Sequence, residues 1–293
     1  MMEKLRVLDL FSGIGGFSLG LERTGGFETV AFCEIDPYCR KVLAKHWPGV
    51  PQYEDIRTLT ADRLAADGIA VDVITGGFPC QDISAAGKQA GIEAERSGLW
   101  SDLCRLIGEI RPKYAIVENV SSLLSGPSEQ RGGWFGRVLG DLAEVGFDAE
   151  WHCISAAAVG APHRRKRIWI VANASGRRRN QSVGGEIQQS WRARAIGAGK
   201  TLADAISNGL QGVSDIGQGE CAGSRQQQGR ALAGSIDTAR TNGNWWHTEP
   251  SVGRVANGVS NRMDRLRGLG NAVVPQIPEL IGYAILASMD AQQ

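Results

Sequence analysis

Apolar residues come in short continuous runs over the first 172 residues, with polar or glycine-rich segments between them. The runs have the length of strands: LRVLDLF (5–11), TVAFCEI (29–35), VDVITGGF (71–78), YAIVENV (114–120) and RIWIVA (167–172). Residues 97–110 carry apolar residues at helical spacing, with Ser97 as the predicted cap. The stretch that begins at Pro37 and residues 134–145 are also predicted to be helical. Strands alternating with helices predict an α/β fold, a doubly wound and mostly parallel sheet covered on both faces.

The pattern changes at Asn173. Residues 173–250 are rich in Gly, Gln, Ser, Asn and Arg and have few apolar runs, which is typical of a long polar insertion. Regular patterning returns near Leu266, and PQIPELIGYAILASM (275–289) predicts an amphipathic helix that packs back onto the first domain. We therefore predict one domain from 1–172 plus 259–293, and a smaller irregular domain at 173–258.

Composition is that of an ordinary globular protein, with 42% hydrophobic and 22% charged residues in 293. No stretch approaches the roughly 18 uninterrupted apolar residues of a membrane helix, and the start lacks a signal-peptide pattern. The six cysteines are scattered without a CxxC pair, so neither a zinc site nor a disulfide framework is indicated. We expect a cytoplasmic protein with reduced thiols and no membrane association.

The net charge of +1 conceals an asymmetry. Residues 1–159 hold 15 Lys and Arg against 22 Asp and Glu, whereas residues 160–293 hold 17 against 9. An acidic first part joined to a basic second part favours a polyanionic partner on one side of the molecule. Chance distribution of charge is the alternative.

A glycine-rich segment, DLFSGIGGFSLG (9–20), follows the first predicted strand. Glycines at a strand-to-helix turn let the backbone approach a ligand and present free N–H groups to it. The dinucleotide pattern GxGxxG would use Gly13 and Gly15, but Ser18 stands at its third glycine. That departure weakens the interpretation as a nicotinamide dehydrogenase.

Acidic residues follow the next strands. Glu34 ends the second strand, where a carboxylate can accept hydrogen bonds from ribose hydroxyls, and Ile35 beside it can cover an adenine face. Asp55 and Ile56 occupy the next such position, where an adenine amino group can be read. Simple solvation of a carboxylate at a strand end is the alternative for Glu34.

Three further motifs carry reactive or charged groups. GGFPCQDIS (76–84) places Cys80 on a loop at the carboxyl end of a strand, and Glu118 in ENV is predicted on the same rim. Arg165 and Arg167 in APHRRKRIWIVA alternate, so both face one side of a strand. The alternatives are an inert core cysteine, a surface glutamate and a solvated basic edge strand.

Together these motifs resemble those of the cytosine-5 DNA methyltransferases. The segments appear in that family's order: DLFSGIGGFSLG, CEIDPY, EDIRTL, GGFPCQDIS, ENV, HRRKR and GLGNAVVPQ. The variable segment lies between HRRKR and GNAVVP, where such enzymes carry their target-recognition region. The resemblance covers nearly the whole chain except residues 173–250, and it implies a Rossmann-like methyltransferase core.

Carried over position by position, the resemblance implies that Cys80 is the nucleophile that attacks C6 of cytosine. It implies that Glu118 holds and protonates N3 and that Arg165 contacts the O2 region, with Arg167 in the same catalytic set. The residues implied to line S-adenosylmethionine are Phe11, Gly13, Gly15, Gly16, Glu34, Ile35, Asp55, Ile56, Pro79, Leu99, Asn271 and Ala272. His163 departs from the Gln that many members carry before the arginines, and Arg262 and Arg265 match only loosely.

The function implied is transfer of a methyl group from S-adenosylmethionine to C5 of a flipped cytosine in a specific double-stranded DNA sequence, through a covalent cysteine adduct and without a metal. The implied protein is a monomer with a cognate restriction endonuclease as its functional partner. Two other interpretations stay open. One is an RNA cytosine-5 methyltransferase that modifies tRNA, and the other is a catalytically silent DNA-binding regulator.

Overall fold

The computed structural model describes residues 3–79, 98–125, 133–174 and 262–290. The first elements in chain order are β1 (Leu5–Leu10), α1 (Gly16–Glu22), β2 (Phe27–Cys33), α2 (Pro37–His46), β3 (Gln52–Tyr53), α3 (Ala61–Ala66), β4 (Val73–Gly76) and α4 (Leu99–Ile110). The later ones are β5 (Tyr114–Val120), η1 (Ser121–Leu124), α5 (Gly133–Glu144), β6 (Phe147–Ser155), η2 (Ala156–Val159), β7 (Lys166–Ala174), α8 (Arg262–Asn271) and α9 (Gln276–Asp290).

One sheet of seven strands runs through the described part, in the order β3-β2-β1-β4-β5-β7-β6. β1 pairs in parallel with β2 and β4, and β5 pairs in parallel with β4. Only β7 runs against its neighbours, pairing antiparallel with both β5 and β6. The prediction of an α/β fold with a mostly parallel sheet is confirmed.

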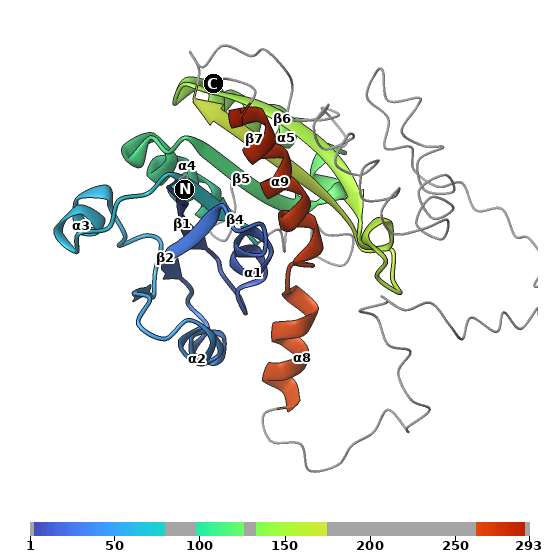
Figure 1. The fold of residues 1–293 in the computed structure, drawn as a ribbon. Helices are drawn as coiled ribbons and strands as arrows, with labels where there is room; N and C mark the ends of the chain where they lie inside the picture. The colour runs from blue at the N-terminus through green and yellow to red at the C-terminus, as the bar shows by residue number, and fades with distance from the viewer. Residues whose placement is uncertain (1–2, 80–97, 126–132, 175–261, 291–293) are drawn as a thin grey trace, which may run out of the picture.

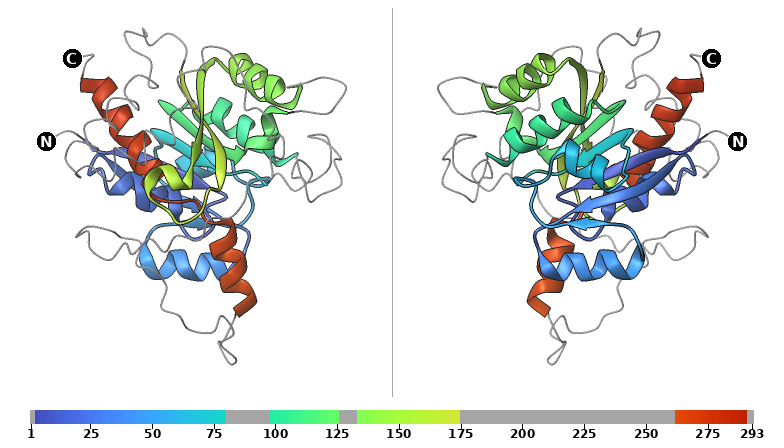
Figure 2. Two further views of the ribbon diagram at one scale, coloured as in Figure 1. Left: turned by 90° about the vertical axis from the view of Figure 1, so that its right-hand side faces the viewer. Right: turned by 90° about the vertical axis from the view of Figure 1, so that its left-hand side faces the viewer.

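Helices cover both faces of this sheet (Figures 1 and 2). On one face, α3, α4 and α5 enclose a cluster of buried side chains that includes Trp100 and Leu142. On the other face, α1 and α9 enclose a second cluster that includes Phe17 and Ile281. Because central strands are buried on both faces, every residue of β4 is buried, which explains why its sequence is a continuous run rather than an alternation.

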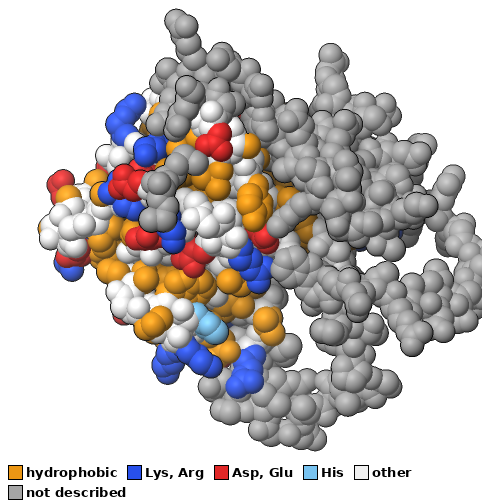
Figure 3. All heavy atoms as spheres, in the orientation of Figure 1, with side chains coloured by type: hydrophobic (Ala, Val, Ile, Leu, Met, Phe, Trp, Pro, Cys, Tyr) orange, Lys and Arg blue, Asp and Glu red, His pale blue; other side chains and the backbone are white. Residues whose placement is uncertain are grey.

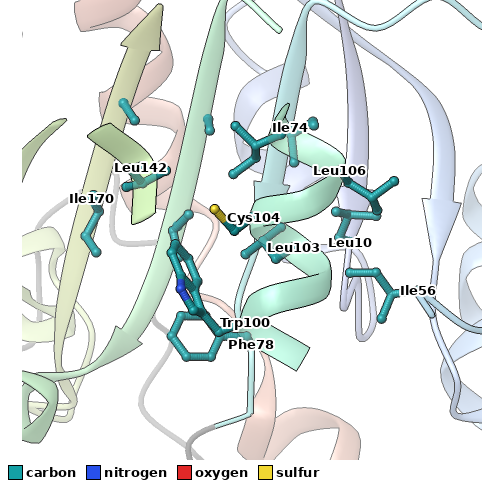
Figure 4. Packing of buried hydrophobic residues seen from close by; sticks show 14 of the residues in the cluster. Leu10, Ile56, Ile74, Phe78, Trp100, Leu103, Cys104, Leu106, Leu142 and Ile170 are labelled. Carbon is teal, nitrogen blue, oxygen red and sulfur yellow. The ribbon is translucent and has the colours of Figure 1, made fainter. Parts of the chain in front are cut away.

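The larger cluster reaches the rim of the sheet at Phe78. Its ring lies 5.2 Å from the Trp100 ring, centroid to centroid, with Leu103 nearby (Figure 4). Trp100 also donates a hydrogen bond from Nε1 to Asp141 on α5, at 2.7 Å. The chain just before Pro79 is thus anchored in the core.

Several elements differ from the sequence predictions. No residue range was predicted for β3, α3 or β6, because β3 has two residues, α3 has six, and β6 (FDAEWHCIS) is an edge strand whose exposed residues are Asp148 and Trp151. The helix predicted over 97–110 begins at Leu99, and its cap is Gly98, without a side-chain hydrogen bond. Ser97, which we predicted as that cap, lies outside the described residues.

The C-terminal helix α9 packs against α1, as predicted (Figure 1). Among the described residues, the stretch Arg267–Asp290 has the length and mean hydropathy (1.3) of a membrane-crossing helix, on composition alone. Half of its most apolar window is buried inside the fold, and α8 ends at Asn271 before α9 begins. Buried helices of globular cores pass the same test. The predicted second domain, 173–258, lies almost entirely outside the described residues.

Candidate active site

Predicted site residues that the structure describes follow the carboxyl ends of β1, β2, β3 and β4 or lie on β5, and these strand ends form one rim of the sheet. Ligands bind at this edge in open α/β sheets, because the loops that follow parallel strands converge there. β1 runs into the glycine turn (residues 11–15), β2 runs into Glu34, and β4 runs into Gly77. Glu118 sits on β5 itself.

The glycine turn and Glu34 are bonded to each other. The Gly13 N–H donates to Glu34 Oε2 at 2.7 Å, and the Asp36 N–H donates to Oε1 at 2.8 Å. Gly13 has φ +54, and a Cβ on it would meet no atom within 4 Å, so the turn opens onto free space. A carboxylate has further lone pairs, so Glu34 is held in place and can still accept from a ligand hydroxyl.

Apolar and acidic groups flank that carboxylate. Ile35 is 66% exposed, an uncovered apolar surface beside Glu34, while Ile56 is buried. The Asp55 carboxylate accepts from Arg57 at Nε and Nη2 (2.9 and 2.7 Å), which lowers the pKa of Asp55. Arg105 on α4 donates to the carbonyl of Ile56 at 3.0 Å. That bond fixes the loop on which Asp55 and Ile56 lie.

A hydrogen bond from Asn119 holds the start of the loop that carries the predicted nucleophile. Its Nδ2 donates to the Phe78 carbonyl at 3.2 Å, and its own side chain is 2% exposed. Gly77 passes close to Glu118, since a Cβ at Gly77 would lie 3.2 Å from Glu118 Oε2. Pro79 is half-buried. Cys80 lies outside the described residues.

Glu118 forms an ion pair with Arg167, with 2.9 Å between Arg167 Nε and Glu118 Oε1. The two side chains are 13% and 24% exposed. Burial raises the pKa of Glu118 above its ordinary value, and the charges of Arg167 and Arg165 oppose that rise. A carboxyl with a raised pKa can hold a proton and donate it to a base.

Arg165 has a different partner. Its Nη1 donates to the Gly270 carbonyl in α8, and its φ of 23 is an uncommon conformation for a residue with a side chain. Arg165 lies just before β7, whose first residue is Lys166, and the charges of both arginines oppose the rise in the pKa of Glu118. That the two side chains share one face of a strand stays a prediction. The arginine paired with Glu118 is Arg167, however. The contact of Arg165 with the cytosine O2 region stays a prediction.

The remaining predicted cofactor residues lie around the same turn. Phe11 is half-buried with φ 52, and Leu99 opens α4. Asn271 ends α8, and the Ala272 N–H donates to the Leu269 carbonyl at 3.3 Å. Gly16 packs directly under this segment, since a Cβ on it would lie 2.5 Å from the Val273 carbonyl oxygen. The structure therefore brings the glycine turn against the GNAVVP segment, as the resemblance implied.

The sequence did not single out the partners that hold these groups. Ser18 Oγ donates to the buried carboxyl of Asp9 at 2.7 Å, so the residue that breaks the glycine fingerprint has a bonding partner of its own. Trp47 packs against Gly15 and donates to Glu22 at 2.9 Å. The sequence offered only a weak indication of these partners, namely that Asp9 is an acidic residue within an apolar strand run.

Three of the described cysteines are poor nucleophiles. Cys33, Cys39 and Cys104 are buried free thiols, and burial raises their pKa to about 12, 12 and 11. A thiol must ionise to attack, so burial disfavours these three. In the described ranges, no group of three or more His, Cys, Asp or Glu side chains is placed to hold a metal ion.

The sheet order and the site on its rim define a Rossmann-like methyltransferase fold. A crystal structure of a prophage-encoded protein from E. coli, described as a DNA modification methyltransferase, superposes with a TM-score of 0.50 and 27% identity. That likeness covers 58% of this chain and 47% of the other. Residues 5–237 match the family model of the C-5 cytosine-specific DNA methylases, and the chain belongs to this family.

Named relatives include two type II methyltransferases. M.Sau3AI of Staphylococcus aureus is 38% identical over 181 residues, which is 58% of this chain and 43% of that protein. M2.BsuMI of Bacillus subtilis (strain 168) is 36% identical over 173 residues, 58% of this chain and 42% of that protein. The matched part thus spans less than half the length of either relative.

Proposed function

We propose that this chain methylates C5 of cytosine in double-stranded DNA, with S-adenosylmethionine as the methyl donor and Cys80 as the covalent nucleophile. The observation that carries the proposal is the Glu118–Arg167 ion pair, on the same rim as the glycine turn with its bound Glu34. Membership of the C-5 cytosine-specific DNA methylase family supports the choice of base and atom.

The described residues fit the proposed cofactor. The open turn at Gly13 offers room for close approach, Glu34 offers a fixed acceptor for ribose hydroxyls, and exposed Ile35 offers an apolar face for adenine. Asp55 already accepts hydrogen bonds from Arg57, and its carboxylate has further lone pairs that could accept from the adenine amino group. When bound, S-adenosylmethionine supplies an electrophilic methyl group on its sulfonium.

In the proposed reaction the Cys80 thiolate adds to C6 of cytosine. The electron pair of the C5–C6 double bond moves between C4 and C5, and the C4–N3 pair moves onto N3, so the ring becomes an enamine whose C5 is nucleophilic. Glu118 in its protonated form donates to N3 and so takes up the developing charge, and Arg167 keeps its carboxyl oriented. After C5 has taken the methyl group, a base removes the C5 proton, the C5–C6 double bond re-forms as the thiolate leaves C6, and N3 returns its proton to Glu118.

The target atom is inaccessible inside a duplex, so the cytosine must be extruded into this pocket at a cost of a few kcal/mol. We propose that residues 173–258, in the basic part of the chain, bind the DNA and choose the sequence. Phosphate contacts by Lys and Arg would supply salt-dependent affinity, and base-edge contacts would supply specificity. A monomeric state and a cognate endonuclease stay predictions.

The test is a Cys80→Ser variant beside a Cys153→Ser control, whose cysteine lies half-buried on edge strand β6. Cys80→Ser should reduce methyl transfer to duplex DNA to background and leave cofactor binding intact, and the control should keep activity. The wild type should also form a covalent complex on 5-fluorocytosine DNA, because fluorine cannot leave as a proton does. Full activity of Cys80→Ser would refute the nucleophile, and methylation of tRNA in place of DNA would refute the substrate.

A further inference from the structure

Asp9 is a fully buried carboxyl in the centre of the sheet for which the proposed reaction has no use. It lies on β1, between Phe32 of β2 and Thr75 of β4 in the strand registers. Both of its oxygens accept hydrogen bonds: Ser18 Oγ donates to Oδ2 at 2.7 Å, and Thr75 Oγ1 donates to Oδ1 at 2.9 Å.

A buried carboxyl at this position costs free energy of folding. Removing an ionisable group from water carries a large desolvation cost that two neutral hydroxyls repay only in part. Burial raises the pKa of Asp9 to about 7, the two hydroxyls oppose that rise, and the nearby negative charge of Glu34 adds to it. An apolar residue would fill the sheet interior at lower cost, so the carboxyl needs a reason other than packing.

The two hydroxyls lead to the two functional segments. Ser18 lies in the first turn of α1, directly after the glycine turn, and Ser12 within that turn donates to the backbone carbonyl of Asp9. Thr75 is the third residue of β4, and the chain continues from it through Gly76 to Phe78 and Pro79. The Ser18–Asp9–Thr75 bridge therefore joins the base of the cofactor turn to the strand that precedes Cys80.

We propose that Asp9 is a positioning residue that fixes the cofactor turn and the nucleophile strand relative to each other through Ser18 and Thr75. The inference rests on the proposed function, because it assigns the distance between methyl donor and nucleophile to this bridge. Side chains locked by buried hydrogen bonds can hold reacting groups within a fraction of an ångström, which proximity catalysis requires.

We expect the two hydrogen bonds of the bridge to affect different steps, one cofactor binding and the other attack on cytosine. Loss of the Ser18 hydroxyl bond leaves only the Ser18 backbone bond to Asp9 and so loosens the α1 side, and cofactor binding should weaken. Loss of the Thr75 bond frees the β4 side, and attack on cytosine should slow while cofactor binding persists. The Asn119 bond to the Phe78 carbonyl remains in both cases, so neither loss releases the loop altogether. A merely structural bridge would give no such division.

The experiment compares Ser18→Ala and Thr75→Val with matched controls. Ser288→Ala removes a buried hydroxyl in α9 that donates to the Ile285 carbonyl. Thr29→Val removes a buried hydroxyl on β2 that has no hydrogen-bond partner among the described residues. For each protein, calorimetry gives the Kd for S-adenosylmethionine. Rapid mixing with 5-fluorocytosine DNA at saturating cofactor gives the rate of adduct formation.

We expect Ser18→Ala to raise the cofactor Kd about 10-fold, with the saturated adduct rate within about 2-fold of wild type. We expect Thr75→Val to lower the saturated adduct rate about 10-fold, with Kd within about 2-fold. The controls should match wild type in both measurements.

The inference would be overturned, with the proposed function intact, if each bridge variant lost equally in both measurements. The same holds if the bridge variants matched their controls in an active protein. A wild type that neither binds the cofactor nor forms the adduct would instead overturn the proposed function, and the inference would fall with it.

Discussion

Two buried carboxyls in this protein face the same physical problem with different partners. Glu118 sits beside Arg167, whose charge offsets part of the cost of burial. Asp9 has two hydroxyls and no cation within hydrogen-bond distance among the described residues. Burial raises the pKa of Asp9 to about 7, despite the hydrogen bonds from the Ser18 and Thr75 hydroxyls and the Ser18 backbone, which favour the ionised form. Asp9 is therefore a group that titrates near neutrality inside the core.

This predicts a pH dependence of stability that Asp9→Asn should remove. Between the ordinary pKa of 3.8 and about 7, the folded protein holds a proton on Asp9 that the unfolded chain has lost. The free energy of unfolding therefore falls as pH rises through that window, by an amount on the order of 4 kcal/mol. Urea unfolding from pH 4 to pH 8 should show Asp9→Asn gaining on wild type as pH rises. Parallel curves would mean that the carboxyl titrates normally.

Sequence reasoning reached the groups that face the site but not those that hold them. Glu118 was predicted on the rim with Cys80, and the two arginines on one side of a strand, because strand ends and alternation can be read along the chain. The pairing with Arg167 rather than Arg165 depends on the antiparallel register of β5 and β7, in which Val120 faces Arg167. The Ser18–Asp9–Thr75 bridge likewise needs the register of β1 and β4, 66 residues apart between Asp9 and Thr75. No local pattern encodes such a register.

At the scale of elements, α1 lies unusually close to the segment that links α8 to α9. Gly16 packs against the Val273 carbonyl and Gly20 against the Pro275 carbonyl, so glycine at these positions makes room for backbone. Two of the glycines that suggested a ligand turn thus serve helix packing. The GNAVVP segment can lie beside the cofactor turn only because this contact is so close.

Gly20→Ala should therefore destabilise the protein. Its Cβ would meet the Pro275 carbonyl oxygen and Pro278, and neither is the flexible end of a side chain that can move aside. We expect a loss of about 1–3 kcal/mol, measured as a lower urea midpoint. Gly140→Ala is the matched control, because it lies in α5 with no atom within 4 Å of the added Cβ. The control should be neutral or stabilising by up to about 1 kcal/mol, and an equal loss in both variants would contradict the packing argument.

The buried elements were the predictable ones. Strands β1, β2, β4 and β5 and helices α2, α4, α5 and α9 all follow from continuous or helically spaced apolar residues. The start of α2 is also encoded locally. Asp36 is its N-cap and accepts hydrogen bonds from the N–H groups of Tyr38 and Cys39, and Pro37 is its first residue. The edge strand β6 was missed, because an edge exposes polar side chains and its pairing with β7 is made through the backbone.

At the scale of the whole molecule, charge separates the two predicted domains. On the face shown in Figure 3, acidic and basic side chains are interspersed with apolar ones over the described core. Residues 177–200, inside the predicted second domain, hold six Lys and Arg against the single acid Glu186. Phosphate binding by such a segment would supply affinity without disturbing a core whose own charges are balanced in local pairs, such as Arg105 with Glu109.

That division predicts that target choice can be moved separately from chemistry. Replacing residues 173–258 with the corresponding segment of a family member that methylates another sequence should change which cytosines are modified. Cofactor affinity should stay within about 2-fold, because Glu34, Asp55 and the glycine turn lie outside the exchanged segment. Bisulfite sequencing of DNA from expressing cells reports position and sequence context together, and Cys80→Ser in the chimera sets the background. A chimera that is active on the original sequence would place base recognition in the catalytic domain.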